Sequence, residues 1–110
     1  MARRWLREQL SKGLTALLVL VVLEREGPMH GYWLRERLSQ LLGYPPPPSS
    51  LYDILKRLES EGLLESYWAL GGTGKARKYY RVTEAGAREA LELATWLRHV
   101  LDSMEVGVSG

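Results

Sequence analysis

A helical pattern that runs directly into a two-strand pattern places the strongest constraint on this chain. From residue 51 the sequence LYDILKRLES places a leucine or isoleucine every three or four residues, which is typical of a helix with one buried face. Gly62 then ends the pattern. Residues 63–70 and 77–82 are short runs rich in tyrosine, tryptophan and leucine, and a glycine-rich segment, 71–76, separates them. This order predicts a helix followed by a β-hairpin with a mobile tip.

The predicted helix has two chemically different faces. Leu51, Leu55 and Leu58, with Ile54 beside them, form an apolar stripe that we expect to face a core. The other face is polar, with Tyr52 at its edge, and carries Ser49, Asp53, Lys56, Arg57 and Ser60.

The start of this helix is predicted near Ser50. Ser50 followed by Asp53 is a weak form of the capping box, with aspartate in place of the usual glutamate. Residues 45–48 are four consecutive prolines, which favour a stiff polyproline connector before the helix. The alternative is that this segment is itself a proline-rich motif that a partner protein binds.

Two helices are predicted before the connector. Residues 14–25 form the first main helix, and Gly27-Pro28 ends it. Residues 1–9 are a short amphipathic segment, either a helical extension or a partly ordered arm. We expect Lys12-Gly13 to interrupt the chain between this segment and the helix 14–25. Residues 31–42 show an amphipathic pattern and form the second helix.

A last helix is predicted from Thr83, as its N-cap, to about Met104. Its apolar residues form a heptad-like seam with a second row beside it, and a helix with two apolar rows requires a second chain to cover it. We therefore expect a homodimer. The predicted interface residues are Leu93, Ala94, Trp96, Leu97, Val100, Leu101 and Met104.

Composition excludes several classes of protein. The 110 residues suit one domain, and a net charge of +2 does not by itself suggest a non-specific nucleic-acid coat protein. The absence of cysteine excludes disulfides, thiolate zinc sites and cysteine nucleophiles, and fits a cytoplasmic protein. The apolar run 14–23 is too short to span a membrane. His30 and His99 lie far apart without further ligands, and no catalytic triplet or phosphate-binding loop is present, so we expect no metal, cofactor or enzyme activity.

Positive charge on two neighbouring elements points to DNA. Lys56 and Arg57 lie on one turn of the helix, next to Tyr52, and suit the phosphates and base edges of a major groove. The hairpin tip adds Lys75, Arg77 and Lys78. A solvated polar face and a solubilising tip are the alternatives, but a second cationic element beside the helix favours DNA.

With these residues in place, the chain resembles the PadR family of transcriptional regulators over about residues 12–104. The marks of the resemblance stand in order along the chain: Lys12-Gly13, Gly27-Pro28-Met29-His30-Gly31-Tyr32, Ser50-Leu51-Tyr52, Leu55-Lys56-Arg57-Leu58-Glu59, Glu61-Gly62-Leu63, Arg77-Lys78-Tyr79-Tyr80 and Thr83-Glu84-Ala85-Gly86. The resemblance implies a mainly α fold with a small β-hairpin: a winged helix-turn-helix in 1–83 with an N-terminal arm, a dimerisation helix in 84–105 and a loose tail in 106–110.

The resemblance also extends the set of expected DNA contacts. Ser49-Ser50 stands where the family usually has Gly-Thr, and Ser50 can replace the threonine as a phosphate contact. Asp53 stands where proline is frequent, and its carboxylate either reads a cytosine amino group or weakens binding. The expected contacts are Ser49, Ser50, Tyr52, Lys56, Arg57, Lys75, Arg77 and Lys78.

An aromatic effector is a further implication of the resemblance. Multidrug-sensing members of the family stack planar ligands between the two copies of the dimer, and Trp96 lies near the middle of the dimer helix. Leu93 and Trp5 are candidates to line the same site. The alternative is that Trp96 is a core or interface residue.

Together these features predict a homodimeric, sequence-specific DNA-binding regulator, with a repressor as the favoured form. Its partners would be double-stranded DNA, a second copy of itself and a small apolar or aromatic effector. The alternative hypotheses are a winged-helix protein-interaction module and a non-specific nucleoid protein.

Overall fold

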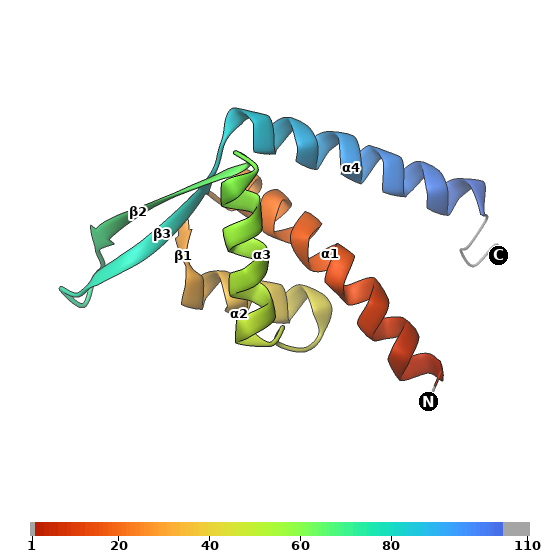
Figure 1. Ribbon diagram of the computed structural model, residues 1–110, viewed down its shortest axis with the longest axis horizontal. Coiled ribbons are helices and arrows are strands. Elements are labelled where there is room, and N and C mark those ends of the chain that lie inside the picture. The colour runs from red at the N-terminus through yellow and green to blue at the C-terminus, as the bar shows by residue number, and fades with distance from the viewer. Residues whose placement is uncertain (1, 105–110) are drawn as a thin grey trace.

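Four helices and a three-stranded antiparallel sheet form the described part of the chain, residues 2–104 of the computed structural model (Figure 1). The elements are α1 (Ala2–Glu26), β1 (Met29–His30), α2 (Gly31–Leu42), α3 (Pro48–Ser60), β2 (Leu64–Leu70), β3 (Ala76–Val82) and α4 (Glu84–Ser103). This confirms the predicted mainly α fold with a hairpin. The predicted tail, 106–110, and residue 105 lie outside the described residues.

Leucine side chains from three helices fill the core. The fully buried ones, at 2% exposure or less, include Leu20 and Leu23 of α1, Leu34 and Leu38 of α2, and Leu51 and Leu55 of α3. Leu58 is also buried, and Ile54 packs against the cluster while remaining partly exposed. The apolar stripe predicted for α3 is therefore confirmed, and the polar face of this helix points outward.

The sheet has the order β1-β3-β2. Strands β2 and β3 pair antiparallel from Leu64 opposite Val82 to Leu70 opposite Ala76, and they extend away from the helices as a long hairpin (Figure 1). Strand β1 adds two residues, with Met29 opposite Tyr80 and His30 opposite Tyr79. The sequence did not reveal β1, because two residues are too few to show strand alternation.

Helix α1 is continuous through Lys12-Gly13, and the predicted interruption is wrong. A glycine inside a helix costs only about 1 kcal/mol relative to alanine, which packing of the buried half of α1 easily outweighs. Side chains on both sides of the glycine also bond back to the preceding turn: Ser11 Oγ donates to the Arg7 carbonyl and Thr15 Oγ1 to the Ser11 carbonyl, both at 2.6 Å.

Helix α3 begins at Pro48, two residues earlier than predicted, and the capping box is wrong. Pro47 occupies the N-cap position without a side-chain hydrogen bond, and Ser50 lies within the first turn. Pro48 is tolerated as the first residue of the helix because its φ is already helical and its missing N–H would have no partner in the first turn. Arg35 Nε donates to the Pro46 carbonyl at 2.8 Å, which holds the shortened connector against α2.

Thr83 ties the start of α4 to the end of α3. Its Oγ1 accepts from the Gly86 N–H at 3.0 Å, as predicted for an N-cap, and donates to the Gly62 carbonyl at 2.7 Å. Gly62 itself has φ +78°, the left-handed conformation that ends α3. The hairpin thus leaves α3 and enters α4 at one bonded junction.

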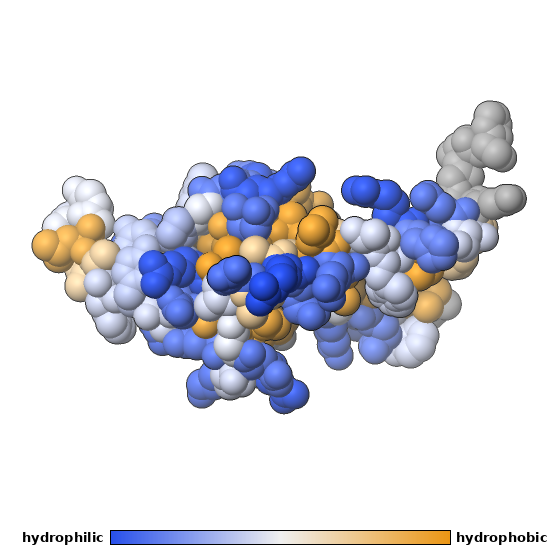
Figure 2. Space-filling view, turned by 90° about the horizontal axis from the view of Figure 1, so that it is seen from above, coloured by the Kyte–Doolittle hydropathy of each residue, from blue (hydrophilic) through white to orange (hydrophobic). Residues whose placement is uncertain are grey.

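Apolar residues are not confined to the core. Figure 2 shows hydrophobic residues gathered at the free end of the hairpin, as well as over the middle of the molecule. Others lie exposed on the first turns of α1 and along α4.

A substitution at Gly86 should destabilise the fold. A Cβ on Gly86 would lie 2.6 Å from Val82 Cγ2 and closer still to the carbonyl oxygen of Leu63, which is backbone and cannot move alone. We expect Gly86→Ala to lower the free energy of unfolding by about 2 kcal/mol or more, measured by urea denaturation.

Gly13 provides the matched control. It is also a helical glycine, but it is exposed and no neighbouring atom lies within 4 Å of a Cβ placed there. We expect Gly13→Ala to raise the free energy of unfolding by up to about 1 kcal/mol. If both substitutions change the free energy of unfolding in the same direction, this description of the packing is wrong.

Candidate nucleic-acid interface

The exposed face of α3 carries every helix residue predicted to contact DNA. Because Leu51, Leu55 and Leu58 are buried, the positions before and between them on the opposite face turn outward. Those positions are exposed and comprise Ser49, Ser50, Tyr52, Asp53, Lys56 and Arg57. No cation lies within 4 Å of the Asp53 carboxylate among the described residues, so its negative charge remains on this face.

Tyr52 joins α3 to the start of α2 and to the hairpin. Its ring packs over Gly31, where a Cβ would lie 2.7 Å from the tyrosine hydroxyl. The same ring borders an open groove of about 240 Å³ whose other walls include Arg77 and Lys78 of β3. The structure therefore brings one predicted contact of the helix, Tyr52, and two of the hairpin, Arg77 and Lys78, to a single groove. The other predicted contacts, Ser49, Ser50, Lys56, Arg57 and Lys75, do not line it.

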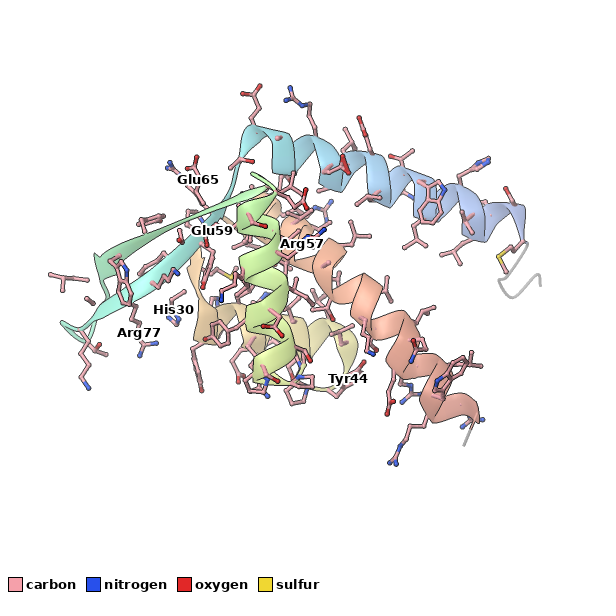
Figure 3. All side chains as sticks on the ribbon, in the orientation of Figure 1. His30, Tyr44, Arg57, Glu59, Glu65 and Arg77 are labelled. Atoms are coloured by element: carbon pink, nitrogen blue, oxygen red, sulfur yellow. The ribbon has the colours of Figure 1, made fainter. Side chains whose placement is uncertain are left out.

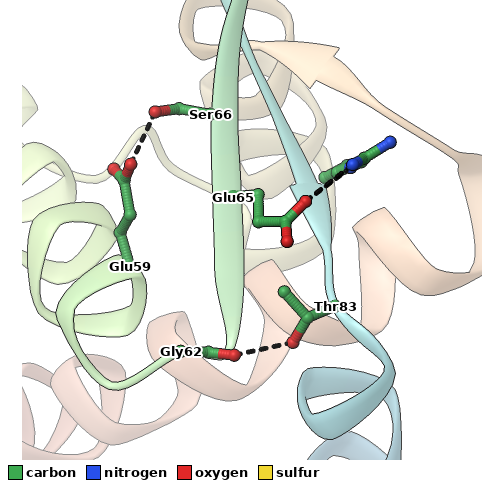
Figure 4. Close-up of polar contacts among 6 residues, drawn as sticks. Glu59, Gly62, Glu65, Ser66 and Thr83 are labelled. Carbon is green, nitrogen blue, oxygen red and sulfur yellow. Dashed lines mark hydrogen bonds and ion pairs between the residues drawn. The ribbon is translucent and has the colours of Figure 1, made fainter.

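The hairpin is strongly cationic. Residues 64–82 contain four cations, Lys75, Arg77, Lys78 and Arg81, and one carboxylate, Glu65. Glu65 is already paired, since Arg81 Nη2 lies 2.7 Å from its carboxylate (Figure 4). Within residues 2–104, Lys75 and Lys78 have no carboxylate within 4 Å. Their charge is available to an external anion.

Arg57 differs from Lys56 in having a partner. Its Nε lies 3.0 Å from the carboxylate of Glu61, the C-cap of α3 four residues later. Exposed pairs of this kind contribute about 0.3–0.5 kcal/mol, so a phosphate can replace the glutamate at little cost. Lys56 is the simpler contact because it breaks no such pair.

His30 has a capping role that the sequence did not reveal. Its Nδ1 accepts a hydrogen bond from the Trp33 N–H at 3.2 Å and so caps α2. Arg77 Nη1 lies 3.5 Å from the same nitrogen (Figure 3), and the ring meets Tyr79 edge-on at 5.5 Å. Burial lowers the pKa of His30, and the charge of Arg77 lowers it further. Histidine is not a favoured N-cap residue, so sequence pattern gave no signal for this role.

The two tyrosines of β3 divide as expected for adjacent strand positions. Tyr80 is buried, and burial raises the pKa of its hydroxyl, with smaller contributions from Tyr52 and Glu59. Tyr79 is half-buried and stacks on Tyr67 of β2 at 5.8 Å. On the α3 side of the sheet, Ser66 Oγ donates to the Glu59 carboxylate at 2.6 Å (Figure 4). These contacts set the angle between the hairpin and α3.

The residues predicted for dimerisation and effector binding form no closed site within one chain. Trp96, Leu93 and Leu101 are exposed on α4, as is Met104 directly after it, and the remaining interface candidates, Ala94, Leu97 and Val100, are half-buried. Trp5 is exposed near the start of α1, and that end of the helix lies apart from α4 (Figure 1).

The described residues hold neither a metal cluster nor a membrane-spanning helix. Within residues 2–104, no group of three or more histidine or carboxylate side chains could hold a metal ion. None of the described helices is long and apolar enough to cross a membrane.

Comparison with known proteins gives one consistent result. Residues 19–92 match the model of the transcriptional regulator PadR-like family. Over 61 residues the chain is 44% identical to transcriptional regulator Rv3488 of Mycobacterium tuberculosis, and the match covers 56% of this chain and 55% of that protein. The chain thus spans about half the length of this curated relative.

Solved structures extend the likeness over most of the chain. A PadR family regulator from Eggerthella lenta is 36% identical, with a TM-score of 0.71 over 96% of this chain and 94% of that one. A PadR-like regulator from Bacillus cereus is 25% identical, with a TM-score of 0.82 over 93% and 98% of the two chains.

The role of His30 as a cap predicts a pH effect on stability. Since the folded state holds the pKa of His30 below its usual value, its contribution is complete above about pH 6.5. That contribution is lost as the pH falls through the lower folded-state pKa, because protonated Nδ1 can no longer accept from Trp33. The most that can be lost is the cap itself, about 1 kcal/mol.

His30→Asn is the matched variant, because asparagine caps helices well and does not titrate. Between pH 8 and pH 5, urea denaturation should show a larger loss of stability for the wild type than for His30→Asn. Identical losses would exclude His30 as the titrating cap.

Proposed function

Since the chain belongs to the PadR-like family of transcriptional regulators, we propose that it is a homodimeric repressor that binds a pseudo-palindromic operator. The observation that carries this proposal is the groove in which Tyr52 of α3 meets Arg77 and Lys78 of β3. A regulator of this family acts on DNA, which points away from an enzyme. In this proposal α3 enters the major groove and the hairpin flanks it as the wing.

Each predicted contact has a role in this arrangement. Lys56 and Arg57 bind phosphate or guanine, and Tyr52 bonds the backbone through its hydroxyl. Ser49 and Ser50 offer hydroxyl and backbone N–H groups at the start of α3, where the helix dipole favours a phosphate. Lys75, Arg77 and Lys78 bind phosphates beside the neighbouring minor groove.

Two other functions fit parts of the same surface. Among the described residues, no cation pairs with the Asp53 carboxylate. This unpaired negative charge favours a protein-interaction module without DNA binding. A nucleoid protein would bind without sequence preference. A steep salt dependence of duplex binding would exclude the protein-interaction module. Tighter binding to one duplex than to a scrambled one would exclude the nucleoid protein.

The dimer is proposed to form through α4, with the exposed N-terminal half of α1 contributing to the interface. Trp96, at 61% exposure, and the exposed Leu93 and Leu101 are large apolar side chains on α4, and Met104, also exposed, is its C-cap. Trp5, Leu6 and Leu10 are likewise exposed on α1. Several large apolar side chains exposed on the same two helices are typical of an interface that a second copy covers. In this division residues 1–83 bind DNA and 84–105 dimerise.

The effector is proposed to bind between the two copies. Trp96 would stack on a planar aromatic molecule, with Leu93 and Trp5 lining the site. Binding can relieve repression only if the effector prefers one angle between the two winged domains. Equal thermal stabilisation of wild type and Trp96→Ala by planar aromatic compounds would exclude Trp96 from that site.

Removal of two cations should weaken DNA binding. We expect Lys56→Ala/Arg77→Ala to bind a duplex from upstream of the protein's own gene at least about tenfold more weakly, with a salt slope smaller by about 4, since each of the two copies loses two cations. Fluorescence anisotropy at two salt concentrations measures both quantities. Arg88→Ala, which removes an exposed cation of α4, is the control and should bind like the wild type. Equal binding by all three proteins would refute the proposed interface.

A charge on the apolar face of α4 should separate the dimer. We expect Trp96→Glu to shift the dimer toward monomer at micromolar concentration, measured by light scattering after gel filtration. Leu91→Glu is the control, because Leu91 is equally exposed but lies about 140° away around the helix. A dimer that survives Trp96→Glu, or is lost only in Leu91→Glu, would place the interface elsewhere.

A further inference from the structure

Two large apolar side chains of the hairpin lie beyond the core. Trp68 is 70% exposed and Leu70 is 74% exposed. Alternate residues of a strand share a face, so both continue the row that begins at Leu64, which is 1% exposed, and passes through Ser66. The apolar row of β2 therefore continues past the core that its first residue fills.

This row lies on the side of the sheet that faces α3. The Ser66 hydroxyl donates to Glu59 of α3, which fixes the face to which the row belongs (Figure 4). Lys78 lies directly opposite Trp68 across the hairpin, and it borders the groove that Tyr52 also lines. Trp68 and Leu70 are thus continuous with the proposed DNA surface.

The surrounding charge indicates the chemistry of the partner. Lys75 and Lys78 lack carboxylate partners among the described residues, and the hairpin's one carboxylate, Glu65, is held by Arg81. An exposed tryptophan and leucine flanked by unpaired cations suit a polyanion that also offers flat apolar surfaces. Stacked bases between two rows of phosphates have both properties.

We propose that Trp68 and Leu70 form an apolar wedge that enters a base step of the minor groove beside each half-site and kinks the duplex. Lys75 and Lys78 bind the phosphates on either side of the wedge. The proposal rests on the proposed DNA-binding function and adds a source of specificity to it. Since TA and CA/TG steps unstack most readily, the wedge favours operators that carry such a step at this position.

Local unstacking can be measured with 2-aminopurine. The probe is placed in turn at each step flanking the half-site, in the upstream duplex that the wild type binds best. At saturation we expect a several-fold rise in 2-aminopurine fluorescence at one step with the wild type. Energy transfer between dyes at the duplex ends should rise in the same complex, because the ends approach when the duplex bends.

Trp68→Ala/Leu70→Ala should still bind, but without the fluorescence rise and with a straighter duplex. Both residues are exposed, so the substitution leaves the core intact. Leu91→Ala, which removes a 69% exposed leucine from α4, is the control and should behave like the wild type.

Three results would overturn the wedge. If the wild type saturates the duplex without a fluorescence rise at any step, the wedge is absent. If the rise is unchanged in the double variant, other residues cause it. If the wild type binds no duplex at all, the proposed function fails together with the wedge, whereas the first two results leave that function standing.

Discussion

Burial of the leucine row of α3 against α1 and α2 is the interaction on which the rest of the structure depends. Leu51 and Leu55 are fully buried, and their position fixes the rotation of the helix about its own axis. The polar positions between them can then point only outward, which exposes Tyr52, Lys56 and Arg57 together. The same packing sets the hairpin beside this face, because Glu59 bonds Ser66 on β2 and Tyr52 lies against the groove at β3. A charged surface is thus oriented by apolar contacts on the opposite side of one helix.

The sequence predicted elements whose signals are local and missed those that depend on distant packing. Thr83 as a cap, Gly62 as a helix end and the leucine period of α3 all act within a few residues, and the structure confirms them. Gly13 gave a local signal that was wrong, since the cost of one helical glycine is small beside the packing of the rest of α1. Strand β1 exists only because Met29 and His30 find partners on β3, fifty residues later.

The same distinction holds for the candidate site. Outward-facing residues of α3 follow from helix geometry, so Tyr52, Lys56 and Arg57 could be placed on one face from sequence alone. Trp68 and Leu70 could not, because aromatic and aliphatic residues in a strand are usually covered. Their exposure depends on how far the hairpin extends beyond the helices, which is a property of the whole fold (Figure 1). The capping role of His30 likewise depends on the fold, because β1 ends and α2 begins at that residue.

The junction at Thr83 bears on how a change at the dimer interface would reach the DNA. Its hydroxyl bonds both the Gly62 carbonyl, at the end of α3, and the Gly86 N–H, in the first turn of α4. The Thr83 N–H also donates to the Leu63 carbonyl at 3.0 Å, and Gly86 allows no Cβ between α4 and that backbone. The base of the hairpin, the end of α3 and the start of α4 are therefore joined by hydrogen bonds and close packing into one unit. If two copies pair through α4, a rotation of one α4 against the other must carry α3 and the hairpin with it. Such a coupling needs no rearrangement inside either winged domain, because the change is confined to the angle between them.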